Sequence, residues 1–124
     1  MNIYYCEICD RICYTYPVDS ELVCCNQPMN LLEAKTEDKG NEKHVPVVKR
    51  LENGKIEVKI GDVPHPMEEK HHIQWVFIDQ GDFYQIGTLS PGDEPKLTFT
   101  IREDLPLDVY EYCNVHGLWV NKDA

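Results

Sequence analysis

Three of the chain's five histidines fall within one short stretch, HPMEEKHH, which runs from His65 to His72. Imidazole side chains gathered in this way can bind a metal ion or carry a proton. His65 and His71 are six positions apart, which turns them to different faces of a helix, about 240° apart, and separates them by roughly 20 Å along a strand. Only a loop that doubles back can bring both rings to one ion, and the sequence PMEE between them is typical of such a loop.

A second pair of donor residues lies near the C-terminal end, where Cys113 and His116 have the spacing C-x-x-H and Gly117 follows. This spacing predicts a metal-binding knuckle, because the turn brings both donors to one side. Glycine accepts the positive φ that closes such a turn. The pair on its own is a moderate signal for a metal site.

With three histidines from earlier in the chain, the C-terminal module offers five candidate donors: His44, His65, His71, Cys113 and His116. Any one of these histidines taken alone would more often be an ordinary surface residue. Structural zinc takes four ligands in a closed tetrahedron, so five donors suit iron with one coordination position left open. On an extended chain His72 would turn away from His71, and we expect it to be exposed.

The N-terminal cysteines form a separate group. Cys6 and Cys9 make a C-x-x-C pair, and Cys24 and Cys25 make an adjacent pair. Two such pairs predict a four-thiolate site for zinc or iron, distorted because consecutive side chains on a strand point to opposite faces. The alternative is structural disulfides, which a reducing compartment disfavours. Cys13 is left over, and we expect it to be a small buried hydrophobic residue.

The composition is that of a folded, acidic protein, with 42% hydrophobic residues, a formal net charge of -10 and a pI near 4.8. This charge argues against nucleic acid or an anionic membrane as the partner. No apolar run approaches the ~20 residues that cross a bilayer. The first residues, MNIYYCEICD, lack the features of a signal peptide. We therefore expect a cytoplasmic protein, in which clustered cysteines favour metal binding over disulfides.

Short alternating segments joined by turn signals predict an all-β fold. Asn53-Gly54 is a strong hairpin signal, and a second hairpin is predicted around the residues DQGD. The pattern indicates a β-sandwich or a small barrel. The cysteine-rich start is too short for a core of its own and needs a staple, and TEDKGNEK is typical of a linker. We predict two domains, residues 1–36 and residues 37–124.

Several motifs together resemble a known family. The blocks EKHVPV, VPHPMEEKHHIQW and CNVHGLW are similar to signature segments of superoxide reductases. CEIC and LVCCNQPM resemble the desulforedoxin-like domain of desulfoferrodoxins, the two-iron members. The resemblance implies an immunoglobulin-like β-sandwich preceded by a small desulforedoxin-like, rubredoxin-type metal domain. The implied ligands are His44, His65, His71, His116 and axial Cys113 for the catalytic iron, and Cys6, Cys9, Cys24 and Cys25 for an N-terminal iron or zinc.

The resemblance also implies an activity: one-electron reduction of superoxide to hydrogen peroxide at non-haem ferrous iron, which an external donor, commonly a rubredoxin, then re-reduces. Glu42 and Lys43 match the family's Glu-Lys dipeptide. There the lysine attracts superoxide and supports protonation, and the glutamate can occupy the sixth position on ferric iron. A homodimer is implied as well. The alternative is a non-enzymatic iron electron carrier or a zinc-stapled interaction module.

Overall fold

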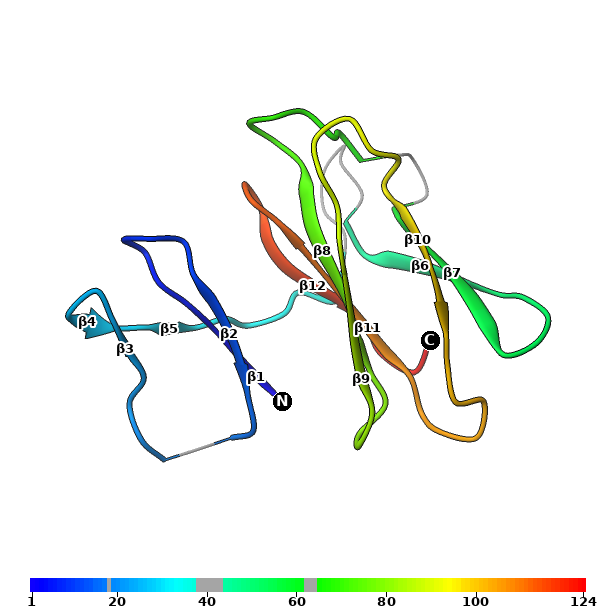
Figure 1. The fold of residues 1–124 in the computed structure, drawn as a ribbon, viewed down its shortest axis with the longest axis horizontal. Helices are drawn as coiled ribbons and strands as arrows, with labels where there is room; N and C mark the ends of the chain where they lie inside the picture. Colours follow the sequence, from blue (N-terminus) through cyan, green and yellow to red (C-terminus); the bar gives the residue numbers. More distant parts are fainter. Residues whose placement is uncertain (18, 38–43, 62–64) are drawn as a thin grey trace. The chain divides into compact units, whose positions relative to one another are not determined.

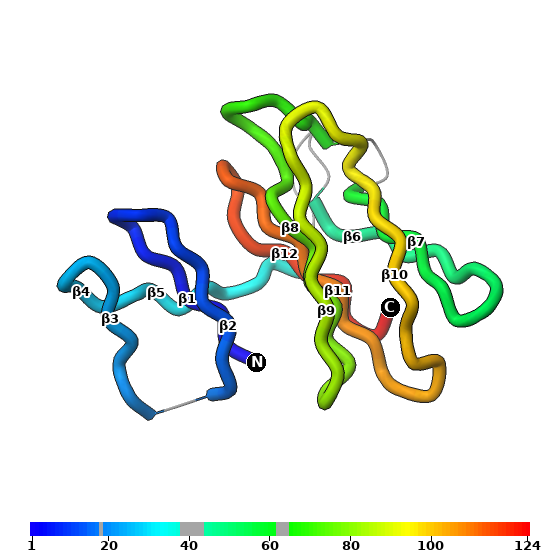
Figure 2. The backbone as a smooth tube through the Cα atoms, viewed as in Figure 1, coloured from blue at the N-terminus to red at the C-terminus, as the bar shows by residue number. Residues whose placement is uncertain are grey.

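The computed structural model describes residues 1–17, 19–37, 44–61 and 65–124. Within these ranges the regular secondary structure consists of β-strands, without helices (Figures 1 and 2). The chain divides into two compact units, Met1–Glu33 and Ala34–Ala124. In the described ranges, no helix has the length and apolar character that a membrane span requires. The assignment of residues 1–36 and 37–124 as separate functional domains stays a prediction.

The first unit is built from very short strands: β1 (Asn2–Tyr5), β2 (Ile12–Thr15), β3 (Val23–Cys24), β4 (Gln27–Pro28) and β5 (Asn30–Leu31). β1 is central and pairs antiparallel with β2 and β5, while β3 pairs with β4. Among its described residues only Ile3 and Cys6 are buried. An apolar core of this size cannot offset the conformational entropy lost when the chain folds. The unit therefore requires a further source of stability, such as a bound metal ion.

The second unit consists of a three-stranded sheet in the order β10-β7-β6 and a four-stranded sheet in the order β12-β11-β8-β9. Neighbouring strands are antiparallel throughout. The strands are β6 (Pro46–Arg50), β7 (Lys55–Ile60), β8 (Ile73–Asp79), β9 (Tyr84–Thr88), β10 (Lys96–Thr100), β11 (Asp108–Cys113) and β12 (Gly117–Asn121).

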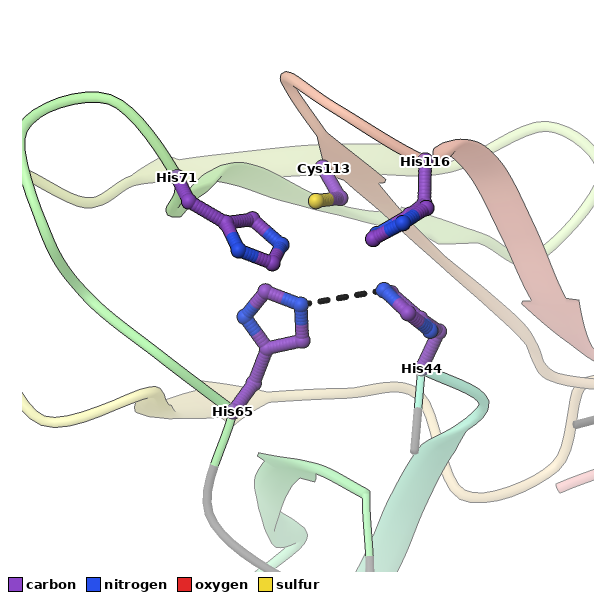
Figure 3. A group of neighbouring side chains, drawn as sticks. All are labelled: His44, His65, His71, Cys113 and His116. Carbon is purple, nitrogen blue, oxygen red and sulfur yellow. Dashed lines mark hydrogen bonds between the residues drawn. The ribbon is translucent and has the colours of Figure 1, made fainter. Parts of the chain in front are cut away.

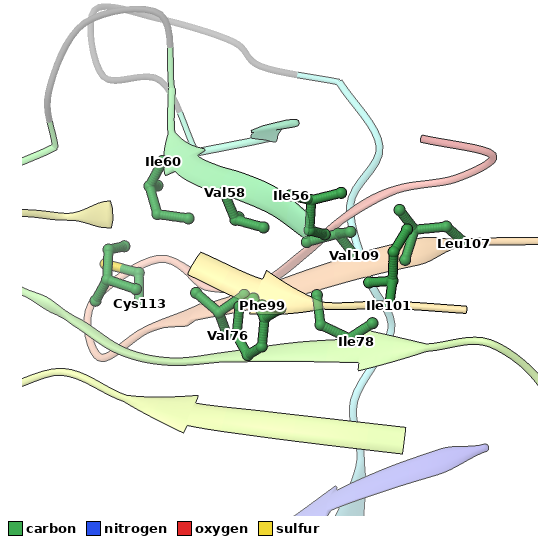
Figure 4. Close-up of a cluster of buried hydrophobic side chains, with 11 residues drawn as sticks. Ile56, Val58, Ile60, Val76, Ile78, Phe99, Ile101, Leu107, Val109 and Cys113 are labelled. Carbon is green, nitrogen blue, oxygen red and sulfur yellow. The ribbon is translucent and has the colours of Figure 1, made fainter. Parts of the chain in front are cut away.

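One hydrophobic core lies between these two sheets (Figure 4). On β7, Ile56, Val58 and Ile60 are fully buried, while the residues between them, Glu57 and Lys59, are not. Burial of each such apolar side chain contributes roughly 1.5–3 kcal/mol to the stability of the fold. A one-residue shift in register would expose all three side chains, so their burial determines which face of β7 lies against the core. The facing side chains from the four-stranded sheet include Val76, Ile78, Val109 and Cys113, while Phe99 lies beside Ile56 on the neighbouring strand β10. A candidate metal ligand, Cys113, is therefore part of the core.

Both predicted hairpins are present. Asn53 and Gly54 connect β6 to β7 with φ values of 61° and 71°, and Gly81, with φ of 85°, lies between β8 and β9. Two facing sheets of three and four strands form an immunoglobulin-like sandwich, and not the small barrel that the strand pattern had left open. The predicted all-β fold class, with a cysteine-rich N-terminal unit, is confirmed.

Candidate metal centres

The segment from His65 to His71 doubles back in the way that the histidine spacing required. The backbone N–H of Glu68 donates to the carbonyl of His71 at 2.9 Å, and the N–H of His71 donates to the carbonyl of Glu68 at 3.1 Å. This reciprocal pair closes a tight turn around Glu69 and Lys70. It brings the His65 and His71 ring centroids to 4.9 Å. The prediction that this loop joins the two imidazoles is confirmed by this contact.

Cys113 and His116 are positioned by the hairpin that joins β11 to β12. Cys113 pairs with Gly117 across the hairpin, and Gly117 has a φ of 85°, as the knuckle requires. The pairing of β11 with β8 also shifts register between Tyr112 and Cys113. Such a β-bulge re-aims side chains and is common beside active sites. Here the register shift skips Gln74 of β8, directly across from the end of β11 that presents the thiol.

The four imidazoles form a closed cycle (Figure 3). The His44 centroid lies 4.6 Å from His65 and 4.9 Å from His116, and His71 lies 4.9 Å from His65 and 5.1 Å from His116. Neighbouring rings are inclined at 64° to 88°. Each ring therefore has two ring neighbours, as at the corners of a square, and we call this arrangement with Cys113 the five-donor site.

The separations between donor atoms fit a metal ion. One ligand atom from each of the five residues lies within 4.8 Å of all the others. The Nε2 atoms of His44 and His65 are 3.0 Å apart. Two ligands at adjacent corners of a square, each about 2.1 Å from an ion, would be about 3.0 Å apart. The five donor atoms thus have the spacing of a metal coordination shell. The sequence predicted which residues belong to this site, but not how far apart their donor atoms lie.

A hydrogen bond outside the donor set orients one of these rings. The Nδ1 of His65 lies 2.7 Å from the carbonyl oxygen of Pro66, so Nδ1–H donates and the lone pair remains on Nε2, which points towards His44. Metal-binding histidines typically use their second nitrogen in this way. His44 and His65 are each 3% exposed and Cys113 is fully buried, so solvent has little access to this side of the five-donor site.

Asn114 connects the two loops that carry the C-terminal donors. Its Oδ1 accepts from the backbone N–H of His72 at 2.8 Å, and its Nδ2 donates to the carbonyl of Lys70 at 3.0 Å. Its own backbone N–H donates to the carbonyl of His72 at 3.2 Å. These bonds fix the segment around His71 against the hairpin of Cys113. Sequence reasoning missed Asn114, and its position inside the C-x-x-H spacing was the available signal.

Because Asn114 fixes the relative positions of two donor loops, we expect Asn114→Ala to weaken metal binding at the five-donor site by about tenfold or more, as is typical for outer-shell partners. Competition between the protein and a chelator for Co²⁺ measures the affinity, in a Cys9→Ser background that disables the four-cysteine site. Val115→Ala, at the exposed neighbouring position, is the control. Equal Co²⁺ affinity in the alanine variants at positions 114 and 115 would contradict this role for the amide.

The four N-terminal cysteines also converge. One sulfur from each of Cys6, Cys9, Cys24 and Cys25 lies within 4.8 Å of the other three, and the Cys9 and Cys24 sulfurs are 3.6 Å apart. Cys25 and Asn26 connect β3 to β4 with φ values of 53° and 62°. Two consecutive positive φ values produce the sharp turn that an adjacent cysteine pair needs if both sulfurs are to reach one ion. We call this group the four-cysteine site.

The protonation behaviour of these thiols suits a bound cation. The backbone N–H of Cys9 lowers the pKa of Cys6 to about 7, because it donates to the thiolate. Hydrogen bonding with the Cys9 sulfur raises the pKa of Cys24 to about 12. Hydrogen bonding therefore moves the pKa values of Cys6 and Cys24 in opposite directions. A cation that coordinates all four would replace the thiol protons and hold the thiolates together.

Several predicted residues lie elsewhere. Glu42 and Lys43 fall outside the described residues, so their catalytic roles stay predictions. His72 is not part of the five-donor site, but it is half-buried and less exposed than expected. Cys13 is half-buried on β2 and is not part of the four-cysteine site, and its sulfur lies 3.9 Å from the carbonyl of Tyr14.

The family model described as desulfoferrodoxin matches residues 36–122, which contain all five donors of the larger site. The chain belongs to the desulfoferrodoxin family. This assignment confirms the family that the motifs predicted.

Relatives of this desulfoferrodoxin-family chain match it over nearly its whole length. A desulfoferrodoxin homolog from Methanothermobacter thermautotrophicus is 49% identical over 119 residues, covering 95% of each chain. A desulfoferrodoxin from Syntrophotalea carbinolica is 50% identical over 121 residues, covering 96% of this chain and 94% of the relative. Among solved structures, the superoxide reductase from Treponema pallidum is 28% identical, with a TM-score of 0.83, and covers 98% of this chain and 97% of that one.

Proposed function

We propose that the protein is a superoxide reductase, which converts superoxide, one electron and two protons into hydrogen peroxide. The observation that carries the proposal is the closed cycle of four imidazoles with a buried thiol within reach of every ring. Similarity to a solved superoxide reductase over 98% of this chain supports it.

The five donors favour iron over structural zinc, because four rings in a square with a fifth donor do not make a closed tetrahedron. Iron held by His44, His65, His71, His116 and Cys113 would supply the electron and an open position for the substrate. At the four-cysteine site, Cys6, Cys9, Cys24 and Cys25 would hold iron or zinc, since both accept four sulfur ligands.

The chain's own residues prepare this site in three ways. The Nδ1–H of His65 donates to Pro66, which leaves the Nε2 lone pair of that ring available for coordination. The buried position of Cys113 shields its sulfur from water, so a solvent molecule does not readily replace it. Asn114 fixes the loops that carry His71 and Cys113, so the donors do not have to be ordered at the moment of binding.

Lys43 and Glu42 are proposed as the residues that act on the substrate. A chain with a net charge of -10 repels superoxide, and a lysine adjacent to the candidate ligand His44 supplies local positive charge. Glu42 would occupy the open position on ferric iron. Both roles rest on the sequence and the family resemblance.

We expect Lys43→Ala to slow the bimolecular reaction with superoxide by about tenfold or more, since charge steering changes association rates by ~10–10³. Higher ionic strength should slow the original protein more than the variant, because salt screens the attraction that the variant has lost. Stopped-flow or pulse-radiolysis rate constants at several salt concentrations test this. Equal rate constants at low salt, with iron loading equal, would leave Lys43 as an ordinary surface charge.

The electron that restores the site must come from another molecule, and we propose a small iron–sulfur donor of the rubredoxin type. A homodimer and a cytoplasmic location stay predictions. The alternative function, a simple electron carrier, draws support from the exposure of Cys9 and Cys25 at the four-cysteine site. A redox partner could approach the metal there.

One stoichiometric experiment separates these functions. The iron-loaded, reduced protein is mixed with a known quantity of superoxide, and both hydrogen peroxide and dioxygen are measured. A superoxide reductase yields one peroxide per superoxide and no dioxygen. A dismutase would release dioxygen, and an electron carrier would leave superoxide to its spontaneous decay. Either of those results would refute the proposed function.

A further inference from the structure

Lys35 is held by its backbone against the edge of β12. Its N–H donates to the carbonyl of Leu118 at 2.9 Å, and its carbonyl accepts from the N–H of Val120 at 2.9 Å. These bonds form a parallel bridge between Lys35 and Trp119. The Cα position of Lys35 is therefore fixed relative to the hairpin that carries His116.

The side chain of Lys35 makes two contacts near the five-donor site. Its Nζ donates to the backbone carbonyl of His116 at 2.9 Å and lies 4.9 Å from the centroid of the Trp119 ring. A lysine at an exposed position loses considerable rotamer freedom when it is held in one conformation. A charge-assisted hydrogen bond and a cation–π contact together favour that conformation.

Trp119 extends the influence of Lys35 to a second donor. The Trp119 and His44 rings are stacked, with centroids 4.6 Å apart and planes inclined by 11°. Trp119 is 6% exposed and His44 is 3% exposed, so neither ring has room to reorient independently. Lys35 thus contacts the backbone of one candidate ligand and the aromatic ring on which another is stacked.

We propose that Lys35 is a positioning residue for the five-donor site, which fixes His116 through its carbonyl and His44 through Trp119. This inference rests on the proposed function only in taking iron as the metal that the five donors bind. The competing interpretation is that the aliphatic part of Lys35 merely covers Trp119, while its ammonium group serves solubility. The two interpretations differ in whether the nitrogen atom matters, which a set of substitutions can decide.

Three variants of the full chain make the test. Lys35→Met keeps most of the apolar stem but removes the donor and the charge. Lys35→Arg keeps both charge and donor capacity and should restore the original behaviour. Lys55→Met, at an exposed position on β7, changes the net charge by the same amount on a strand that contributes none of the five donors.

The first measurement uses the metal-free protein, so it is independent of the proposed function. The ring resonances of all the histidines are recorded by NMR. Lys35→Met should shift the resonances of His44 and His116 more than those of His65 and His71, while Lys35→Arg and Lys55→Met should leave them close to the original positions. Unshifted His44 and His116 resonances in Lys35→Met would overturn the proposal.

The second measurement uses the iron-loaded protein in a Cys9→Ser background, which disables the four-cysteine site. It follows the thiolate-to-iron absorption band of the five-donor site during iron removal by a chelator. Lys35→Met should lose iron about tenfold faster and show a shifted absorption band. A change of about tenfold is typical when a residue that contacts a metal ligand, but not the metal, is replaced. The proposal would also be overturned if Lys35→Met shifts the histidine resonances of the metal-free protein but changes neither the rate of iron loss nor the absorption band. If the original protein holds no iron at this site, the proposed function fails, and the same retention test with Co²⁺ still decides the role of Lys35.

Discussion

Replacement of Cys113 by serine is expected to abolish superoxide reduction and to remove the contribution of the five-donor site to the thiolate-to-iron absorption. Cys113 is fully buried within the sandwich core, and its sulfur is the one donor of the five-donor site that is not an imidazole. A neutral hydroxyl is a harder and much weaker electron donor than a thiolate. We expect the rate to fall by about a hundredfold or more, because even outer-shell partners contribute ~10–100-fold.

Pulse-radiolysis rates and visible spectra of iron-loaded Cys113→Ser test this expectation. Two controls separate loss of the ligand from general damage. Cys13→Ser makes the same substitution at a half-buried cysteine outside both sites, and His72→Ala removes the histidine next to His71 that does not join the five-donor site. Both controls should retain activity. A visible spectrum that stays unchanged in Cys113→Ser would show that this cysteine is not a ligand.

The second large effect concerns the first unit. We expect Cys9→Ser to release the metal from the four-cysteine site and to unfold residues 1–33, while superoxide reduction at the five-donor site continues. Ile3 and Cys6 are the only buried residues among those described in this unit, so the metal must supply most of its stability. Structural zinc sites contribute about 10–16 kcal/mol in small domains of this kind, which have almost no core of their own.

Hydrogen exchange resolved by residue is the direct measurement. Amides of β1 and β2 should lose protection in Cys9→Ser, whereas those of β8 and β11 should keep it, because the sandwich has its own hydrophobic core. Cys13→Ser serves again as the control, since it removes a thiol from the same unit. Protected β1 and β2 amides in metal-free Cys9→Ser would contradict the structural role of the metal. A superoxide rate near background, with the five-donor site loaded, would contradict the independence of the two sites.

The sequence by itself determined which residues are candidate donors and which kind of fold carries them. The C-x-x-C pair of Cys6 and the C-x-x-H pair of Cys113 are local patterns, and coordination chemistry limits what such spacings can do. Alternation of buried Ile56, Val58 and Ile60 with polar residues is also local, because side chains alternate along any strand. The hairpin at Asn53-Gly54 follows from backbone conformations that few residues adopt.

Only the tertiary structure decided how the donors are arranged. The order of the four imidazoles around their cycle depends on how the loop before β8, the segment before β6 and the β11–β12 hairpin come together in space. The supporting roles of Asn114 and Lys35 were likewise invisible, because each contacts residues distant in the chain. Such contacts are set by strand register and by packing between sheets, and a local pattern of residue types does not specify either one.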